Sequence, residues 1–145
     1  MEDVHKKLAV DLFNHTWTLL DKADRTLDDD EELLMSAWAS RYHWSKVGTP
    51  LNAARGEWQL SRVYSVLGRA EPALHHARRT LELCEQHGYG DFDLAFAYEA
   101  LARAHAVVGD RTQRDRYYQM GIAAAEGIKE MEDKDLFLSD LNKVP

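Results

Sequence analysis

Arginine side chains recur at helical spacing in the middle of the chain, and guanidinium groups are suited to binding carboxylates. Arg55 and Arg62 are seven residues apart with Trp58 between them, so one helix face would carry all three. Glu99 and Arg103, four residues apart, would share a face of another helix. Guanidinium groups beside an indole can hold an acidic peptide or a free C-terminus. The predicted partner-binding residues are Arg55, Trp58, Gln59, Arg62, Glu99 and Arg103.

The same arginines also fit a structural interpretation. Glu57, Glu99 and the acidic residues of the preceding helix could pair with them inside the protein. The stretch between Lys46 and Lys129 uses arginine as its basic residue and contains no lysine. This bias suits bidentate recognition of carboxylate or phosphate groups, but codon usage in a GC-rich genome would produce it as well. The sequence alone therefore leaves partner binding and internal pairing open.

A second candidate site is the aromatic segment 38–44, which reads Trp-Ala-Ser-Arg-Tyr-His-Trp. Its rings could wall a pocket for a ligand, which would make the protein a small helical enzyme or a small-molecule binder. A histidine with a shifted pKa in an enclosed cavity would favour this alternative. We prefer to explain the aromatic residues by packing in the core and between helices. The residues of the alternative pocket would be Arg41, His43, Trp44 and His105.

The sequence gives little support for a metal-binding site or a catalytic nucleophile. Asp11 and His15 have the spacing of two ligands on one helix face, but a surface ion pair explains them as well. His75 and His76 are adjacent and so point to different sides of a helix. Cys84 falls on an apolar stripe, where we expect a buried, inert thiol. The sequence has no phosphate-loop, calcium-loop or nucleophile-elbow pattern, so we expect a non-enzymatic protein without cofactor or metal.

Composition is that of an acidic globular protein. The 145 residues are 45% hydrophobic and 30% charged, which fits one domain with one core. The net charge of −7 opposes binding to nucleic acid. No apolar run approaches the roughly 18 residues of a membrane span, and the polar first seven residues do not resemble a secretory leader. With a single cysteine, the chain is expected to be cytoplasmic.

Helical periodicity runs through nearly the whole chain, and no segment alternates in the manner of a strand. We therefore predict an all-α fold of six long helices and a short C-terminal capping helix. The turns are short, so neighbouring helices must pack antiparallel as stacked hairpins. The single domain 1–145 divides into an N-terminal hairpin, two further hairpins and the cap, at residues 1–48, 51–88, 91–130 and 133–142.

Local signals predict the helix ends and the buried faces. Asp28 with Glu31 is typical of a capping box at the start of the second helix, and Gly68 and Gly109 are typical helix stops. The sixth helix is expected to end near Lys129. Apolar spacing predicts one stripe on each of the first two helices, namely Val4, Leu8, Leu12, Thr16, Leu20 and Ala23, and then Leu34, Trp38, Tyr42 and Ser45.

Two of the hairpins share a pattern that repeats after 41 residues. Its members in the first copy are Leu60, Ser61, Tyr64 and Gly68, and in the second Leu101, Ala102, His105 and Gly109. Over about residues 54–128 this pattern resembles the tetratricopeptide repeat family, whose hairpins carry a leucine, a small residue and a tyrosine at this spacing. The copies depart from the family at Glu57, which stands in an aromatic position, and at His105, which replaces the tyrosine.

The resemblance implies a particular surface and a particular function. The repeat is longer than the usual ~34 residues by about two helical turns, which nearly preserves the facing of each side chain. In this family the first helix of each hairpin lines the concave face, so the predicted partner-binding residues would line it. The implied function is a non-enzymatic scaffold for a peptide or partner protein. Self-association is a close variant, because the end hairpins leave faces that need cover.

Overall fold

The computed structural model describes residues 3–145, and within this range it consists of seven α-helices and no strand. Met1 and Glu2, which open the segment used to argue against a secretory leader, lie outside the described residues. In the described range no helix is both long and apolar enough to cross a membrane. The helices are α1 (Val4–Leu20), α2 (Leu27–Val47), α3 (Pro50–Val66), α4 (Ala70–His87), α5 (Asp91–Val108), α6 (Arg111–Ala125) and α7 (Met131–Asn142).

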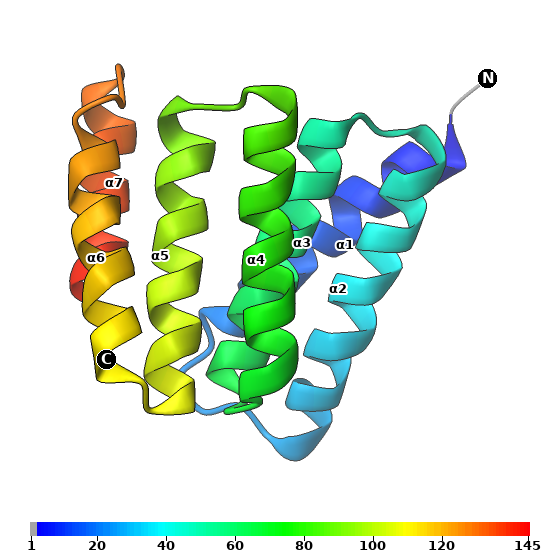
Figure 1. Ribbon diagram of the computed structural model, residues 1–145. Coiled ribbons are helices and arrows are strands. Elements are labelled where there is room, and N and C mark those ends of the chain that lie inside the picture. The colour runs from blue at the N-terminus through cyan, green and yellow to red at the C-terminus, as the bar shows by residue number, and fades with distance from the viewer. Residues whose placement is uncertain (1–2) are drawn as a thin grey trace.

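Successive helices pair as antiparallel hairpins, and the hairpins stack side by side (Figure 1). The closest partners are α1 with α2, α3 with α4, and α5 with α6, while α4 packs against α5 and α2 against α3. The first helices of the two repeated hairpins, α3 and α5, lie side by side as predicted. The short α7 packs on α5 and α6. The predicted all-helical hairpin stack with six long helices and a short C-terminal one is confirmed.

Glycines end the repeated helices because they adopt a backbone conformation that other residues resist. Gly68 and Gly109 have φ angles of +74° and +88°, in the left-handed region, and each follows the first helix of its hairpin. Both helix stops are confirmed. The sixth helix, by contrast, ends at Ala125 rather than near Lys129, and a turn leads to α7.

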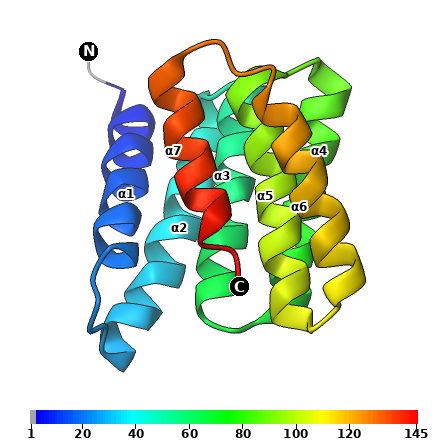
Figure 2. The same cartoon turned by 90° about the vertical axis from the view of Figure 1, so that its left-hand side faces the viewer.

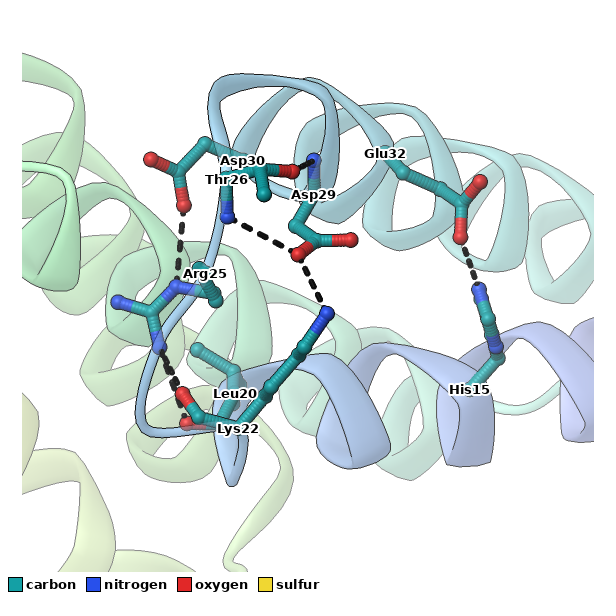
Figure 3. A network of polar contacts seen from close by, with 8 residues as sticks. All are labelled: His15, Leu20, Lys22, Arg25, Thr26, Asp29, Asp30 and Glu32. Atoms are coloured by element: carbon teal, nitrogen blue, oxygen red, sulfur yellow. Dashed lines mark hydrogen bonds and ion pairs between the residues drawn. The ribbon is translucent and has the colours of Figure 1, made fainter.

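The start of α2 differs from the sequence prediction. The capping box pairs Thr26 with Asp29, so it lies two residues before the predicted pair of Asp28 and Glu31. The turn before α2 is held by Arg25, whose guanidinium donates to the Leu20 carbonyl and to the Asp30 carboxylate (Figure 3). The acidic run 28–32 therefore starts a helix and fastens the turn before it.

The buried faces of α1 and α2 also differ from the predicted stripes. Small side chains meet between these helices, and two hydroxyl groups are satisfied there: Ser40 donates to the Ala9 carbonyl at 2.7 Å, and Thr16 shares a 2.7 Å hydrogen bond with Ser36. Trp38, which we expected on the buried stripe, is half-exposed. Small residues lie on the buried face because they let two helix backbones approach closely. Val4, Leu8, Tyr42 and Ser45 of the predicted stripes are likewise exposed.

The 41-residue repeat extends to side-chain contacts that the sequence pattern did not include. Tyr64 on α3 stacks on His76 of α4, with ring centroids 5.6 Å apart and planes 4° from parallel. In the second hairpin His105 on α5 stacks on Tyr117 of α6 at 5.5 Å and 8°. Each residue corresponds to its counterpart 41 positions later, with tyrosine and histidine exchanged. The two hairpins therefore share one packing geometry.

Candidate partner-binding face

A buried ionic cluster joins α3 and α5 at the centre of the predicted partner-binding residues. Nη2 of Arg62 donates to both carboxylate oxygens of Glu99, each at 3.2 Å, and Nε of Arg103 donates to one of them at 2.7 Å. The Glu99 side chain is 0% exposed, and those of Arg62 and Arg103 are 11% and 14% exposed. Arg62 and Arg103 occupy equivalent positions of the repeat, 41 residues apart.

The short helix α7 lies against this cluster (Figure 2). A carboxylate oxygen of Asp140 is 3.6 Å from Nη2 of Arg62, and the Asp140 main-chain carbonyl accepts a 3.2 Å hydrogen bond from Arg103. Beside these contacts Phe137, which is completely buried, packs edge-to-face on Phe96 with centroids 5.0 Å apart. The part of the predicted face around Arg62 and Arg103 is therefore occupied by the chain's own C-terminal helix.

Aromatic rings continue the face from α7 towards α1. Trp58 of α3 lies between Phe96 of α5, at 5.0 Å, and Trp17 of α1, at 5.2 Å. The guanidinium carbon of Arg62 is 5.6 Å from the Trp17 ring and 5.9 Å from the Trp58 ring, which is within the range of cation–π attraction. Two donors at this point, Nε1 of Trp58 and Nε of Arg62, are buried without a hydrogen-bond partner among the described residues.

The other members of the predicted set have separate surroundings. Arg55 forms a bidentate ion pair with Asp93 of α5: its Nε donates to Oδ1 at 3.0 Å and its Nη2 to Oδ2 at 3.2 Å. The Arg55 side chain remains 47% exposed. Gln59 is buried and donates to the Phe13 carbonyl at 2.9 Å, which fastens α1 to α3. In this conformation Gln59 and Glu99 have no surface to offer a partner.

Internal pairing, the alternative that the sequence left open, accounts for the arginines of the predicted set. Glu99 pairs with the two central arginines, and Asp93 on α5 pairs with Arg55. Asp93 was not among the expected carboxylates, which were Glu57, Glu99 and acidic residues of the second helix. The pairing is compatible with a binding role only where the side chains keep exposed surface or α7 moves away. Partner contact by the arginines and Trp58 stays a prediction.

The four residues of the alternative pocket do not meet. His43 makes a 2.8 Å hydrogen bond to His5 near the start of α1, whereas His105 stacks on Tyr117 at the far hairpin. Burial lowers the pKa of His105, but none of the other three residues accompanies it. Trp44 lines a shallow pocket beside Val10, Phe13, Asn14, Asn52 and Arg55, which contains none of the other three.

Arg41, the remaining member of that set, belongs to an acid–imidazole cluster that the sequence did not predict. Its Nε lies 3.3 Å from Oε2 of Glu57, while Nδ1 of His76 lies 3.3 Å from Oε1. Burial alone would raise the pKa of Glu57, but the hydrogen bond and charge of His76, together with Arg41, outweigh burial and lower it. Glu57 and His76 are both buried, and the rings of Tyr64 and Trp38 pack on the His76 ring.

The candidate metal and thiol residues have structural roles. His15 pairs with Glu32 at 2.6 Å (Figure 3). Asp11 pairs instead with Lys7 at 2.7 Å, so the two predicted ligands have different partners. Within residues 3–145 no group of three or more His, Cys, Asp or Glu side chains could hold a metal ion. Cys84 is buried as expected, and burial raises the pKa of its thiol to about 11.

Comparison with known proteins adds no family assignment. A scan against protein-family models, a search of curated proteins and a search of solved structures each found no match. The resemblance to tetratricopeptide repeats therefore stays a prediction from the sequence. The function has to be argued from the face built by α3, α5 and α7.

Proposed function

We propose that this protein is a non-enzymatic, tetratricopeptide-like scaffold that binds a peptide segment or a partner protein on the face of α3 and α5. The observation that carries the proposal is the convergence of Arg62 and Arg103 on one buried carboxylate beside Trp17 and Trp58. Without α7, these two guanidinium groups would face the single charge of Glu99. One positive charge would then remain beside an aromatic surface, which suits an acidic partner.

Rigidity of the stack supports a binding role. The groups of the face are held in place by helix packing and by mutual hydrogen bonds, so little ordering cost opposes binding. The acid–imidazole pair of Glu57 and His76, which has the chemistry of a catalytic pair, is enclosed by aromatic rings. A cytoplasmic location belongs to the same proposal and is supported by the buried, unpaired thiol of Cys84.

Site-specific crosslinking in the native host tests this function. A photo-crosslinking amino acid replaces Arg55, a half-exposed member of the face, and in a control chain it replaces Met35, an exposed residue of α2 outside the predicted face. The proposal expects one protein to be crosslinked from position 55 and not from position 35. Crosslinks only from position 35, or from neither position, would overturn it.

A further inference from the structure

The contacts of α7 follow a pattern by which helices are recognised in grooves. Its buried apolar residues and the one that follows it, Phe137, Leu141 and Val144, stand at positions i, i+4 and i+7. Asp140, at i+3, reaches the buried ionic cluster. The opposite side of the helix stays exposed, including the large side chains of Met131 and Leu136. α7 is thus bound along one amphipathic stripe.

The receiving surface is shaped for the apolar part of that stripe. Phe137 and Leu141 pack over Gly121 of α6, where an added Cβ atom would lie 3.4 Å from Phe137 and 3.5 Å from Leu141. An added Cβ would thus make ordinary contact with both side chains, and only a residue with atoms beyond Cβ would crowd them. Phe96 of α5 closes the other side of the Phe137 ring. A bulky ring and a leucine one turn apart fit this surface.

The polar contacts select the negative end of a helix. Arg103 donates to the Asp140 carbonyl, and Arg114 of α6 donates to the Pro145 carbonyl at 2.9 Å and to the Val144 carbonyl at 3.1 Å. The Asp140 carbonyl lies in the last turn of α7, where it also accepts from the Lys143 amide, and carbonyl groups at a helix C-terminus carry partial negative charge. The two carbonyls that Arg114 binds follow the helix, which ends at Asn142, so these contacts hold the main chain at and just beyond the helix end whatever its side chains are.

Charge favours the same type of ligand. The helix α7 carries four acidic residues and one lysine. The surface that receives it presents Arg62, Arg103 and Arg114 with the carboxylates of Glu99 and of Asp115, which pairs with Arg114 at 3.0 Å. Two buried donors lack acceptors among the described residues: Nε of Arg62, the arginine that Asp140 approaches, and Nε1 of Trp58, whose ring centroid is 5.9 Å from that guanidinium carbon. An incoming carboxylate could satisfy donors that Asp140 leaves unsatisfied.

We propose that α7 is an internal stand-in for the partner, which is an acidic amphipathic helix with bulky apolar residues at i, i+4 and i+7 and a carboxylate at i+3. This inference rests on the function proposed above. It adds the class of ligand and the way in which α7 regulates access to the binding face. The partner replaces α7 on the face of α3, α5 and α6. Because α7 is tethered, its effective concentration is in the mM range, so a partner at lower concentration binds only by making better contacts or after α7 is released.

A peptide of residues 130–145 with a fluorescent label tests the proposal on the full-length chain. The peptide competes with the tethered α7, so its binding to the unmodified protein is weak. The double substitution Phe137→Ala and Leu141→Ala in the protein weakens the internal occupant and leaves the receiving surface intact. Fluorescence anisotropy should show the peptide binding this variant about 100-fold more tightly than the unmodified protein. A matched variant with Leu138→Ala, on the exposed side of α7, should behave as the unmodified protein does.

Peptide variants give the specificity. A peptide carrying Phe137→Ala and Asp140→Ala should lose binding to the opened protein, whereas a peptide carrying Leu138→Ala should retain it. The proposal is overturned if the opened protein keeps its helical circular dichroism and binds none of the peptides. It is also overturned if the unmodified protein forms a dimer by exchanging α7, because the occupant is then a second copy of this chain.

Hydrogen exchange on the unmodified protein keeps the test decisive if the double variant unfolds. The amides of α7 should exchange faster than those of α3 and α5, and excess peptide should accelerate exchange in α7 alone. Exchange of α7 only together with α3 and α5 would mean that it is an inseparable part of the core, which would overturn the proposal. Crosslinking from position 55 can succeed in that case, so failure of this inference is distinguishable from failure of the proposed function.

Discussion

Replacing Glu99 by glutamine tests the buried ionic cluster most directly. The carboxylate accepts hydrogen bonds from Arg62 and Arg103 and is 0% exposed. Glu99→Gln removes the charge and turns an amide NH2 towards a guanidinium group. Both arginines then keep their charges at 11% and 14% exposure, with only Asp140 nearby to balance them. Removing one partner of such a buried pair costs about 3–5 kcal/mol.

That cost is large relative to the whole stability of a domain, which is about 5–15 kcal/mol. For a chain of this length it corresponds to a fall of about 10–20 °C in Tm. Urea unfolding followed by circular dichroism gives the free energy, and tryptophan fluorescence includes a contribution from this site because two of the four tryptophans, Trp17 and Trp58, flank Arg62. The two signals should shift together in the variant.

Glu82→Gln is the matched control. Glu82 pairs with Arg79 at 3.2 Å, the same distance as between Arg62 and Glu99, but its side chain is 63% exposed. An exposed pair contributes about 0.2–1 kcal/mol. The two carboxylates therefore differ chiefly in burial, and Glu99 has in addition a second arginine, Arg103, at 2.7 Å. If Glu99→Gln destabilises the protein no more than Glu82→Gln, the cluster does not hold α3 and α5 together and the reasoning is refuted.

Three further predictions follow from local contacts. Gly56→Ala should destabilise the protein by about 1–3 kcal/mol, because the new Cβ would come within 2.7 Å of the Arg41 side chain. Thermal melts measure the effect, and Gly90→Ala, with open space around position 90, is the control. Cys84 should not react with a thiol reagent at pH 8 until urea unfolds the chain, since burial raises the pKa of the thiol to about 11; reaction of the folded protein would contradict this. Glu57→Gln should lower stability at neutral pH. Because the pKa of Glu57 is lowered in the folded state, the difference in unfolding free energy between the variant and the unmodified protein should shrink as pH falls from about 4.3 through the folded-state pKa. If urea melts show the same difference at every pH, the lowered pKa of Glu57 is refuted.

Local rules were enough to predict the repeated hairpins. A helix stop such as Gly68 or Gly109 depends on its own backbone conformation, so the residue type carries the information. The faces of α1 and α2 were predicted from apolar spacing, and the prediction was right for Thr16 but wrong for Val4, Trp38 and Tyr42, which are exposed. Which face is buried there depends on how closely two backbones approach, and Ser40 and Thr16 permit that approach while their hydroxyl groups find acceptors or partners.

The candidate site was predictable only in part, for a similar reason. Helical spacing correctly grouped Arg62 with Trp58 and Glu99 with Arg103 on the faces of α3 and α5, because spacing within a helix fixes which side chains are neighbours. Spacing says nothing about contacts between distant segments. The approach of Asp140 to Arg62 depends on where the turn after α6 directs α7, and no local pattern encodes that.

The repeat itself explains why the ionic cluster is short of negative charge. Arg62 and Arg103 occupy the same position in successive hairpins, so stacking brings both to one place. The position of Glu99 in the second hairpin is taken by Trp58 in the first, so two guanidinium groups share one repeat carboxylate. A second carboxylate has to come from outside the repeats. Asp140 of α7 supplies it in this conformation, and any segment that replaces α7 must supply it as well, because a buried arginine without a partner is strongly unfavourable.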